Sequence, residues 1–408
     1  MTSARELTLG RTEGGVSASR AHNRVRPLRA DDLEDVARLF LERFRTDRVS
    51  RSAAARREVA QFMQRLYLQG PAAGSDPDSL VQITERGDVG AFVGVMRAAF
   101  TLDGKPVSVG VTGALMTAAD PRNGLAAVQL LRELRHRSLD LVYTDTANRA
   151  SLALCQASKY KVLSPESLEW ACVFKPASAA VHKLGQRAPF LPKAMAASAA
   201  GLLDAAVSKW LRRAPPRRLP AGWRDEEADA SGFVEAAPIG LEKFRLRPAA
   251  SSAHLHWLVA MAAERESAGP MHLRVLRDRS GVVAGHYAFH GEAGGVARVF
   301  QAVATPGNWG VLIDGIVETT RELGCVGVHG CARGDLLPHL YAIPGLFLYY
   351  AGGALYQTPR ADIAEAIESG SAFLGGLNGD RWTRLATDRF GASRSTSGFD
   401  ASGVASLL

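Results

Sequence analysis

Cysteine is scarce in this chain, and its few cysteines have no metal-binding pattern. The 408 residues include four cysteines, Cys155, Cys172, Cys325 and Cys331. They form no C-x-x-C pair and have no histidines at zinc-ligand spacing, so we expect no metal site. Each falls in an apolar stretch, which favours buried free thiols. Unpaired cysteines suit a reducing compartment, and we expect a cytoplasmic location.

Long hydrophobic runs are also absent. No stretch approaches the roughly 20 apolar residues of a membrane-spanning helix. Residues 1–23 are polar and lack the apolar centre of a secretory signal. We expect this segment to be disordered, together with the Ser/Gly-rich tail, residues 389–408.

The charge balance favours anionic partners without naming one. Lys and Arg number 49 against 41 Asp and Glu, a formal net charge of +8. Such a surface suits CoA or another anion, or it is simply solvated. The basic residues are spread out and no basic-aromatic strand motif accompanies them, so we expect no nucleic acid, with tRNA as a lesser alternative. The oligomeric state cannot be derived from these features.

The segment Val107–Tyr160 carries the most specific pattern. It reads as a strand, a glycine-containing turn, a helix from Leu125, a second strand ending at Asp145, and a second helix. A helix that starts just after a strand presents free backbone N–H groups and a positive dipole end, which suit a phosphate or pyrophosphate. Gly124 allows the backbone to approach such a ligand closely.

This segment resembles the acetyl-CoA-binding half of the GNAT (GCN5-related N-acyltransferase) superfamily. Gly124 and Ala126 match the glycine and small-residue positions of the loop that wraps the CoA pyrophosphate there. Asn148 matches the asparagine that starts the following helix, and Tyr160 matches a later aromatic. Pro121, Lys159 and Cys155 depart from the pattern, and Cys155 stands where a proton-donating tyrosine is frequent.

The resemblance implies a set of site residues. The acyl carbonyl would be held by the backbone of Leu115, Met116 and Thr117. The pyrophosphate would lie over Arg122, Asn123, Gly124, Leu125, Ala126 and Ala127, and Asn148 would contact the pantetheine arm. Asp145 is the candidate general base, with Tyr143, Tyr160 and Cys155 as candidate proton donors. Turn, cap and core roles for these residues stay open as alternatives.

The second half of the chain repeats the same order of elements. Strands at 271–276, 282–289 and 296–304, a helix at 309–323 and a strand at 325–331 parallel the first half. Trp309 stands where the first copy has a small residue, so we expect the second copy not to hold CoA. The segment from Gly370 to Trp382 resembles the closing motif of bacterial tandem GNAT proteins.

These patterns predict an α/β protein of mixed, α+β type with two tandem GNAT-like domains. We expect a first domain at 24–175, a proline-rich linker at 176–222 and a degenerate second domain at 223–388. The linker contains an amphipathic helix at 190–213 with a basic end. That helix either contacts an anionic membrane surface or connects the two domains, and apolar faces at helical spacing favour the connector.

The leading hypothesis is a bacterial N-acyltransferase, most simply an N-acetyltransferase. It would use acetyl-CoA or another acyl-CoA and a small-molecule amine as acceptor. The competing hypothesis is a non-catalytic tandem module that binds or assembles other molecules. In one form of this hypothesis the module lies at a membrane surface. The sequence identifies neither the acceptor nor the acyl length.

Overall fold

The computed structural model describes residues 24–44, 52–72, 76–119, 125–187, 200–204, 218–264, 269–343 and 345–383. The expected disordered ends and most of the expected helix at 190–213 lie outside these ranges. Within them, no helix combines the length and apolar character needed to cross a bilayer.

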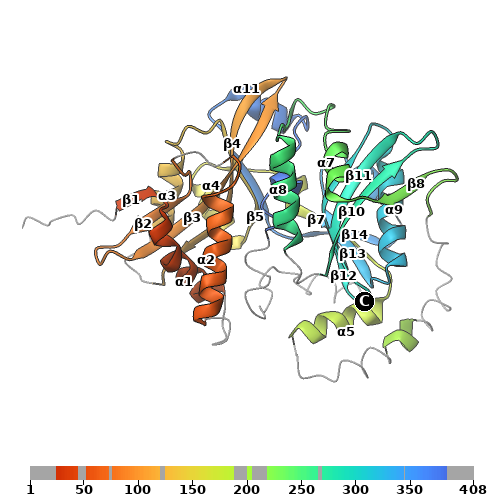
Figure 1. The fold of residues 1–408 in the computed structure, drawn as a ribbon, viewed down its shortest axis with the longest axis horizontal. Helices are drawn as coiled ribbons and strands as arrows, with labels where there is room; N and C mark the ends of the chain where they lie inside the picture. The colour runs from red at the N-terminus through yellow and green to blue at the C-terminus, as the bar shows by residue number, and fades with distance from the viewer. Residues whose placement is uncertain are drawn as a thin grey trace, which may run out of the picture.

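Two mixed sheets stand side by side, and helices flank them (Figure 1). In spatial order the first sheet contains β1 (Arg24–Pro27), β2 (Leu80–Ile83), β3 (Val89–Leu102), β4 (Lys105–Thr117), β5 (Leu141–Ala147), β15 (Gly353–Gln357) and β6 (Lys161–Val162), with β9 (Leu246–Pro248) paired to β3. The second contains β14 (Leu346–Tyr350), β7 (Leu168–Val173), β13 (Gly327–Cys331), β12 (Val296–Ala304), β11 (Val283–His290), β10 (Met271–Arg277) and β8 (Arg224–Glu227).

The helices are distributed over both halves of the chain. They are α1 (Leu33–Phe44), α2 (Ala53–Tyr67), α3 (Ala126–Leu134), α4 (Arg149–Ala157), α5 (Pro176–Arg187), α7 (Ala230–Ala236), α8 (Ser252–Ala263), α9 (Trp309–Glu322), α10 (Leu337–Leu340) and α11 (Ala361–Glu368). Short 3-10 turns occur at η1 (Ala30–Asp32), η4 (Pro165–Ser167) and η5 (Gly376–Asn378).

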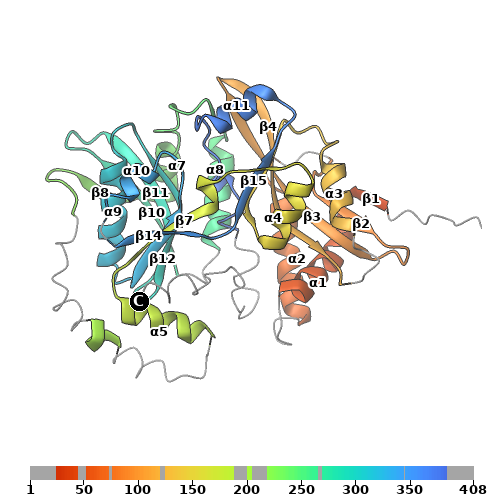
Figure 2. The same ribbon diagram turned by 180° about the vertical axis from the view of Figure 1, so that it is seen from behind.

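The two faces of the first sheet are covered by different helices, as Figures 1 and 2 show from opposite sides. Side chains alternate across a strand, so Phe92 packs with α1 and α2 whereas Ala91 and Val93 pack with α3. The helical spacing predicted for 30–44 is confirmed, since Leu33 and Phe40 are buried on one face of α1.

Each sheet contains a strand from the other half of the chain, which corrects the sequence-based arrangement. Residues 168–173 fall in the range expected for the first domain, but β7 lies between β13 and β14 in the second sheet. Residues 353–357 fall in the range expected for the second domain, but β15 lies between β5 and β6 in the first sheet. Both strands are buried over four consecutive residues, which fits an internal strand but does not specify its partner.

The two copies share one topology and one core. In each copy a parallel strand pair, β4 with β5 or β12 with β13, is joined by a crossover helix, α3 or α9. The largest apolar cluster runs from Leu28 in the first half to Trp382 in the last segment, and α8 contributes Leu258 to it. The halves are therefore joined through the interior.

Candidate functional site

The strands β4 and β5 separate near their carboxyl ends. Their parallel pairing ends at Val111 with Tyr143, although both strands continue. On its other side β4 carries a bulge against β3, where the register shifts between Phe92 and Gly94. Ala114 lies in this bulge with a φ of 52°, a conformation that few non-glycine residues adopt. The predicted carbonyl-binding residues Leu115, Met116 and Thr117 follow directly and line one side of the separation.

The helix α3 begins just beyond the end of β4. Its first turn carries Ala126 and Ala127, both buried, and the preceding Leu125 is 69% exposed. The Leu125 side chain is thus exposed at the helix start. The predicted loop residues Arg122, Asn123 and Gly124 lie outside the described residues.

Asn148 performs the helix-capping role that the sequence left open for it. Its side-chain oxygen accepts a hydrogen bond from the Ser151 backbone N–H at 2.9 Å, at the start of α4. Among the described residues the amide –NH₂ of Asn148 has no hydrogen-bond partner, and it can donate to a ligand.

The last described segment of the chain enters the separation between β4 and β5. The Thr146 hydroxyl on β5 donates to the Asp380 carboxylate at 2.6 Å, and a Cβ added to Gly113 on β4 would lie 2.5 Å from Oδ1 of Asp380. The carboxylate therefore spans from one strand to the other. Gly113 is required here because any side chain would displace Asp380.

A tyrosine from α2 lies beside the same point. Gly94 pairs with Gly113 across β3 and β4, so the two glycines leave a hollow on one face of the sheet. The Tyr67 ring fills the part over Gly94, where an added Cβ would lie 2.3 Å from the ring. Its hydroxyl is buried and has no hydrogen-bond partner among the described residues.

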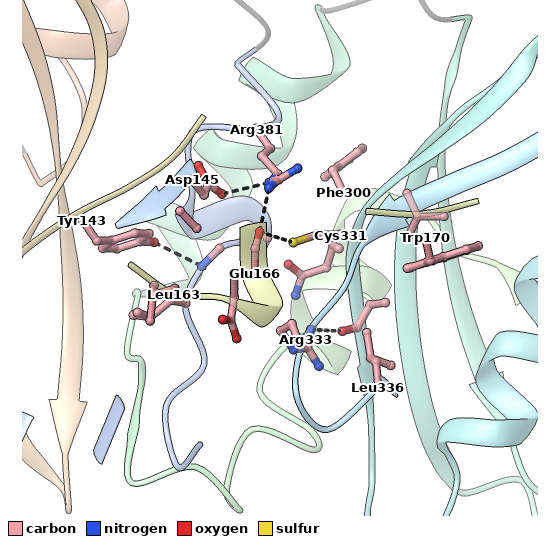
Figure 3. A pocket seen from close by; sticks show the side chains of 17 residues that line it. Tyr143, Asp145, Leu163, Glu166, Trp170, Phe300, Cys331, Arg333, Leu336 and Arg381 are labelled. Atoms are coloured by element: carbon pink, nitrogen blue, oxygen red, sulfur yellow. Dashed lines mark hydrogen bonds and ion pairs between the residues drawn. The ribbon is translucent and has the colours of Figure 1, made fainter. Parts of the chain in front are cut away.

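A cavity of about 30 Å³ lies between the two sheets next to Asp145 (Figure 3). Tyr143 and Asp145 of β5 line it, together with Glu166, Gln301 and Arg381 from elements far apart in sequence. Two of the four predicted catalytic residues are thus brought together on one wall.

Buried charges are linked behind this wall. Arg381 contacts Glu169 at 2.5 Å and lies 3.9 Å from Asp145, and its guanidinium also donates to the Glu166 carbonyl oxygen at 2.8 Å. Burial acts to raise the pKa of Glu169, but the hydrogen bond from His329 and the charges of His329 and Arg381 hold that pKa well below its usual value. The positive charge of Arg381 is therefore balanced by the carboxylates of Glu169 and Asp145.

The two predicted residues on β5 differ in how free they are. Burial raises the pKa of Asp145, and the nearby Arg381 charge opposes this shift. The Tyr143 hydroxyl donates to the Asn378 carbonyl oxygen and accepts from the Gly375 N–H. Burial raises the pKa of Tyr143 well above its ordinary value. Tyr143 thus makes two hydrogen bonds, whereas the Asp145 carboxylate accepts the Asp380 N–H and lines the cavity.

Cys155 and Tyr160 lie elsewhere. Both belong to the apolar cluster beneath α3 and α4, with Leu130 and Leu355, and neither lines the cavity. Burial raises the pKa of the Cys155 thiol to about 11 and raises that of Tyr160 further above its usual value. The structure does not bring these two side chains to Asp145.

Asp380, Arg381 and Tyr67 are site residues that sequence reasoning missed. The sequence signal for Asp380 and Arg381 was the closing segment from Gly370 to Trp382. Its resemblance to tandem GNAT proteins indicates a fold, but it does not indicate where the segment lies in that fold. Asp380 and Asp145 are 235 residues apart and meet through the Asp380 N–H, which donates to Asp145 at 2.9 Å. Local pattern does not encode such a contact.

In the second copy, Trp309 covers the start of α9. Its indole is 3% exposed, with the Lys243 ammonium 4.6 Å and the Arg333 guanidinium 5.0 Å from the ring. In the first copy the first residue of α3 is the small Ala126. Absence of CoA from the second copy stays a prediction, and this burial agrees with it.

Comparisons with known proteins identify the fold. A probable N-acyltransferase from Enterococcus faecalis V583 is 11% identical over 82% of this chain and 72% of its own, with a TM-score of 0.52. A GCN5-related N-acetyltransferase from Anabaena variabilis ATCC 29413 is 10% identical over the same shares, with a TM-score of 0.53. No protein-family model and no curated protein matches the sequence. The chain thus has the GNAT fold in two tandem copies.

Proposed function

We propose that this chain is an acyl-CoA-dependent N-acyltransferase that moves an acyl group from a CoA thioester to an amine of a small molecule or sugar. The separation of β4 from β5 beyond Val111 and Tyr143 carries this proposal. It leaves β4 and β5 unpaired with each other close to the start of α3, and a thioester and a diphosphate would lie next to each other there.

The donor would lie along the face covered by α3 and α4. The amides from Arg122 to Ala127 would bind the diphosphate at the positive end of the α3 dipole. The backbone of Leu115, Met116 and Thr117 would hold the thioester carbonyl, which gains negative charge in the transition state. Asn148 would donate its amide N–H to the pantetheine arm.

The acceptor would enter from the cavity on the other side of β5. An amine must lose a proton to attack the thioester, and the carboxylates near that wall suit this step. Asp145 is one of these carboxylates, and Tyr143 is part of the wall. Cys155 and Tyr160 would support the donor face from within the core.

Binding of the donor is the first test. Thermal unfolding of the full chain is measured with acetyl-CoA, with longer acyl-CoAs and with free CoA. A donor site stabilises the folded state by a concentration-dependent amount, about 2.7 kcal/mol at a hundred times Kd. No shift with any of these compounds would remove the proposal.

The occupied separation between the strands favours a second candidate, a non-catalytic binding or assembly module. Asp380 already fills the space beside Gly113. On this account acyl-CoA neither binds nor reacts, so the same titration separates the two.

A further inference from the structure

Asp380 lies between β4 and β5 beyond their last paired residues, and its N–H is bonded to Asp145, which lines the cavity proposed for the acceptor. The Asp380 carboxylate lies against Gly113 of β4 and accepts from Thr146 of β5. Thr146 is exposed, so its hydroxyl links the Asp380 carboxylate to the solvent side of β5. A backbone gap between two strands that is filled by an ionisable group is suited to proton transfer across it.

The surroundings of Asp380 contain hydroxyls and another acid. The Thr383 hydroxyl donates to it at 3.0 Å, and its own N–H donates to Asp145. The titratable groups that face it are Asp145 on β5, Tyr67 on α2 and Tyr143 on β5. Among the described residues no cation pairs with Asp380, because the Arg381 guanidinium contacts Glu169 and lies near Asp145.

This environment makes Asp380 ready to exchange a proton near neutral pH. Burial, with the like charge of Asp145 next, raises the pKa of Asp380 to about 7, while the Thr146 and Thr383 hydrogen bonds oppose the shift. Such a pKa lets one carboxyl group both accept and return a proton.

We propose that Asp380 is the proton-transfer residue of the acyl transfer, with Asp145 as the residue that tunes it; this rests on the proposed function. The amine nitrogen forms a bond to the thioester carbonyl carbon and loses one proton to the Asp380 carboxylate. The carbon–sulfur bond then breaks, and Asp380 gives that proton to the departing sulfur. Amide and CoA thiol are formed, and the carboxylate is restored.

Asp145 acts through Asp380. Its charge opposes ionisation of the neighbouring carboxyl group. Replacing it with a neutral amide of the same shape keeps an oxygen for the Asp380 N–H and removes the like charge. The Asp145→Asn change should therefore lower the pKa of Asp380, an effect that a structural role alone does not produce.

The test compares wild type, Asp380→Asn, Asp145→Asn and a control, Asp88→Asn, which changes an exposed turn carboxylate of the same sheet. Release of CoA thiol from acetyl-CoA is followed with glucosamine, lysine, spermidine and a lysine-containing peptide, and products are identified by mass. Thermal unfolding and acetyl-CoA affinity are measured for every variant.

The expected results are specific. Asp380→Asn lowers kcat by about 100-fold or more and leaves acetyl-CoA affinity unchanged. The wild-type kcat rises with pH through a midpoint near 7, and Asp145→Asn moves that midpoint to lower pH. Asp88→Asn matches wild type.

Two outcomes would overturn the inference in distinguishable ways. A folded Asp380→Asn protein with wild-type kcat and pH profile removes Asp380 from the mechanism and leaves the enzyme proposal standing. Wild type that fails to bind acetyl-CoA removes the proposed function, and the role of Asp380 with it.

Discussion

Leu125 offers a residue-scale test of the diphosphate site. It is 69% exposed at the start of α3, so Leu125→Glu adds a negative charge without filling the core. A glutamate there is favourable to the helix dipole, so α3 itself should not be weakened. We expect acetyl-CoA affinity to fall by about tenfold, because one unit of like charge at this range is worth about 1.4 kcal/mol. Isothermal calorimetry measures the change.

Leu125→Gln is the matched neutral control. It should bind acetyl-CoA close to wild type, and the loss in the glutamate variant should shrink as salt is raised. Equal weakening by both substitutions, or by neither, would contradict a diphosphate at this helix end.

Asp380 also gives a residue-scale prediction for stability. Unfolded, its carboxyl group has the ordinary pKa of 3.8, and in the fold the pKa is about 7. Between these values the folded state retains a proton that the unfolded state has lost, so the contribution to stability falls as pH rises and is constant above the window. Asp380→Asn should remove this slope, which is about 4 kcal/mol across the window.

Urea unfolding at pH 5 and pH 8 measures that slope for both proteins. The Asp88→Asn control should keep the wild-type slope. A wild type whose stability rises between these pH values by the same amount as that of Asp380→Asn would show that Asp380 is ionised throughout.

At this scale the sequence predicted part of the site. Asp145 and Tyr143 line one cavity, since they are two positions apart on one face of one strand, and their catalytic roles stay a prediction. Cys155 and Tyr160 were grouped with them by resemblance, but α4 carries them into the core beneath α3. Asp380 was missed because only folding brings residues 145 and 380 together.

The exchanged strands are tested at the scale of elements. Leu355 on β15 is fully buried between β5 and β6. Leu355→Ala should cost about 2–5 kcal/mol, because a large buried side chain is lost. Hydrogen–deuterium exchange should rise first in β5 and β6, although those strands precede Leu355 by about two hundred residues.

Trp170 on β7 gives the reciprocal experiment. It is 2% exposed and lies between β13 and β14. Trp170→Ala should raise exchange in those two strands of the second sheet. Val282, which is 61% exposed, provides a control in Val282→Ala. Loss of protection in the first sheet for Trp170→Ala, or in the second sheet for Leu355→Ala, would contradict the placement of β7 and β15.

Helices and strands were easier to predict than the pairing between strands. The strand at 296–304 was predicted with the bounds that β12 has, and α9 differs from its prediction by one residue. The spacing of apolar residues identifies a helix or a strand, because it depends only on residues close together in the sequence. Pairing depends on which edge is free once other strands have assembled, so β7 and β15 were assigned to the wrong sheets.

The whole molecule should unfold as one unit. Each sheet needs an internal strand from the other half, and the main core contains residues of both. Residues 24–175 expressed alone would lack β15, and residues 218–383 would lack β7. We expect neither fragment to give a cooperative thermal transition, whereas the full chain gives one.

Calorimetry of the three proteins checks this expectation. The Arg65–Glu264 ion pair, which joins α2 to α8 at 2.5 Å, supplies a control, because breaking it should lower Tm without splitting the transition. Two separate transitions in the full chain, or a stable fragment, would show that the halves are independent domains.

The sequence by itself determined the elements, the tandem repeat and the strand–turn–helix that suits a diphosphate, because period, caps and small residues act over a few positions. Only the tertiary structure determined which sheet contains β7 and which contains β15. Only folding places Asp380 between β4 and β5. Those outcomes depend on contacts between residues more than a hundred positions apart, which are selected by the packing of the complete core.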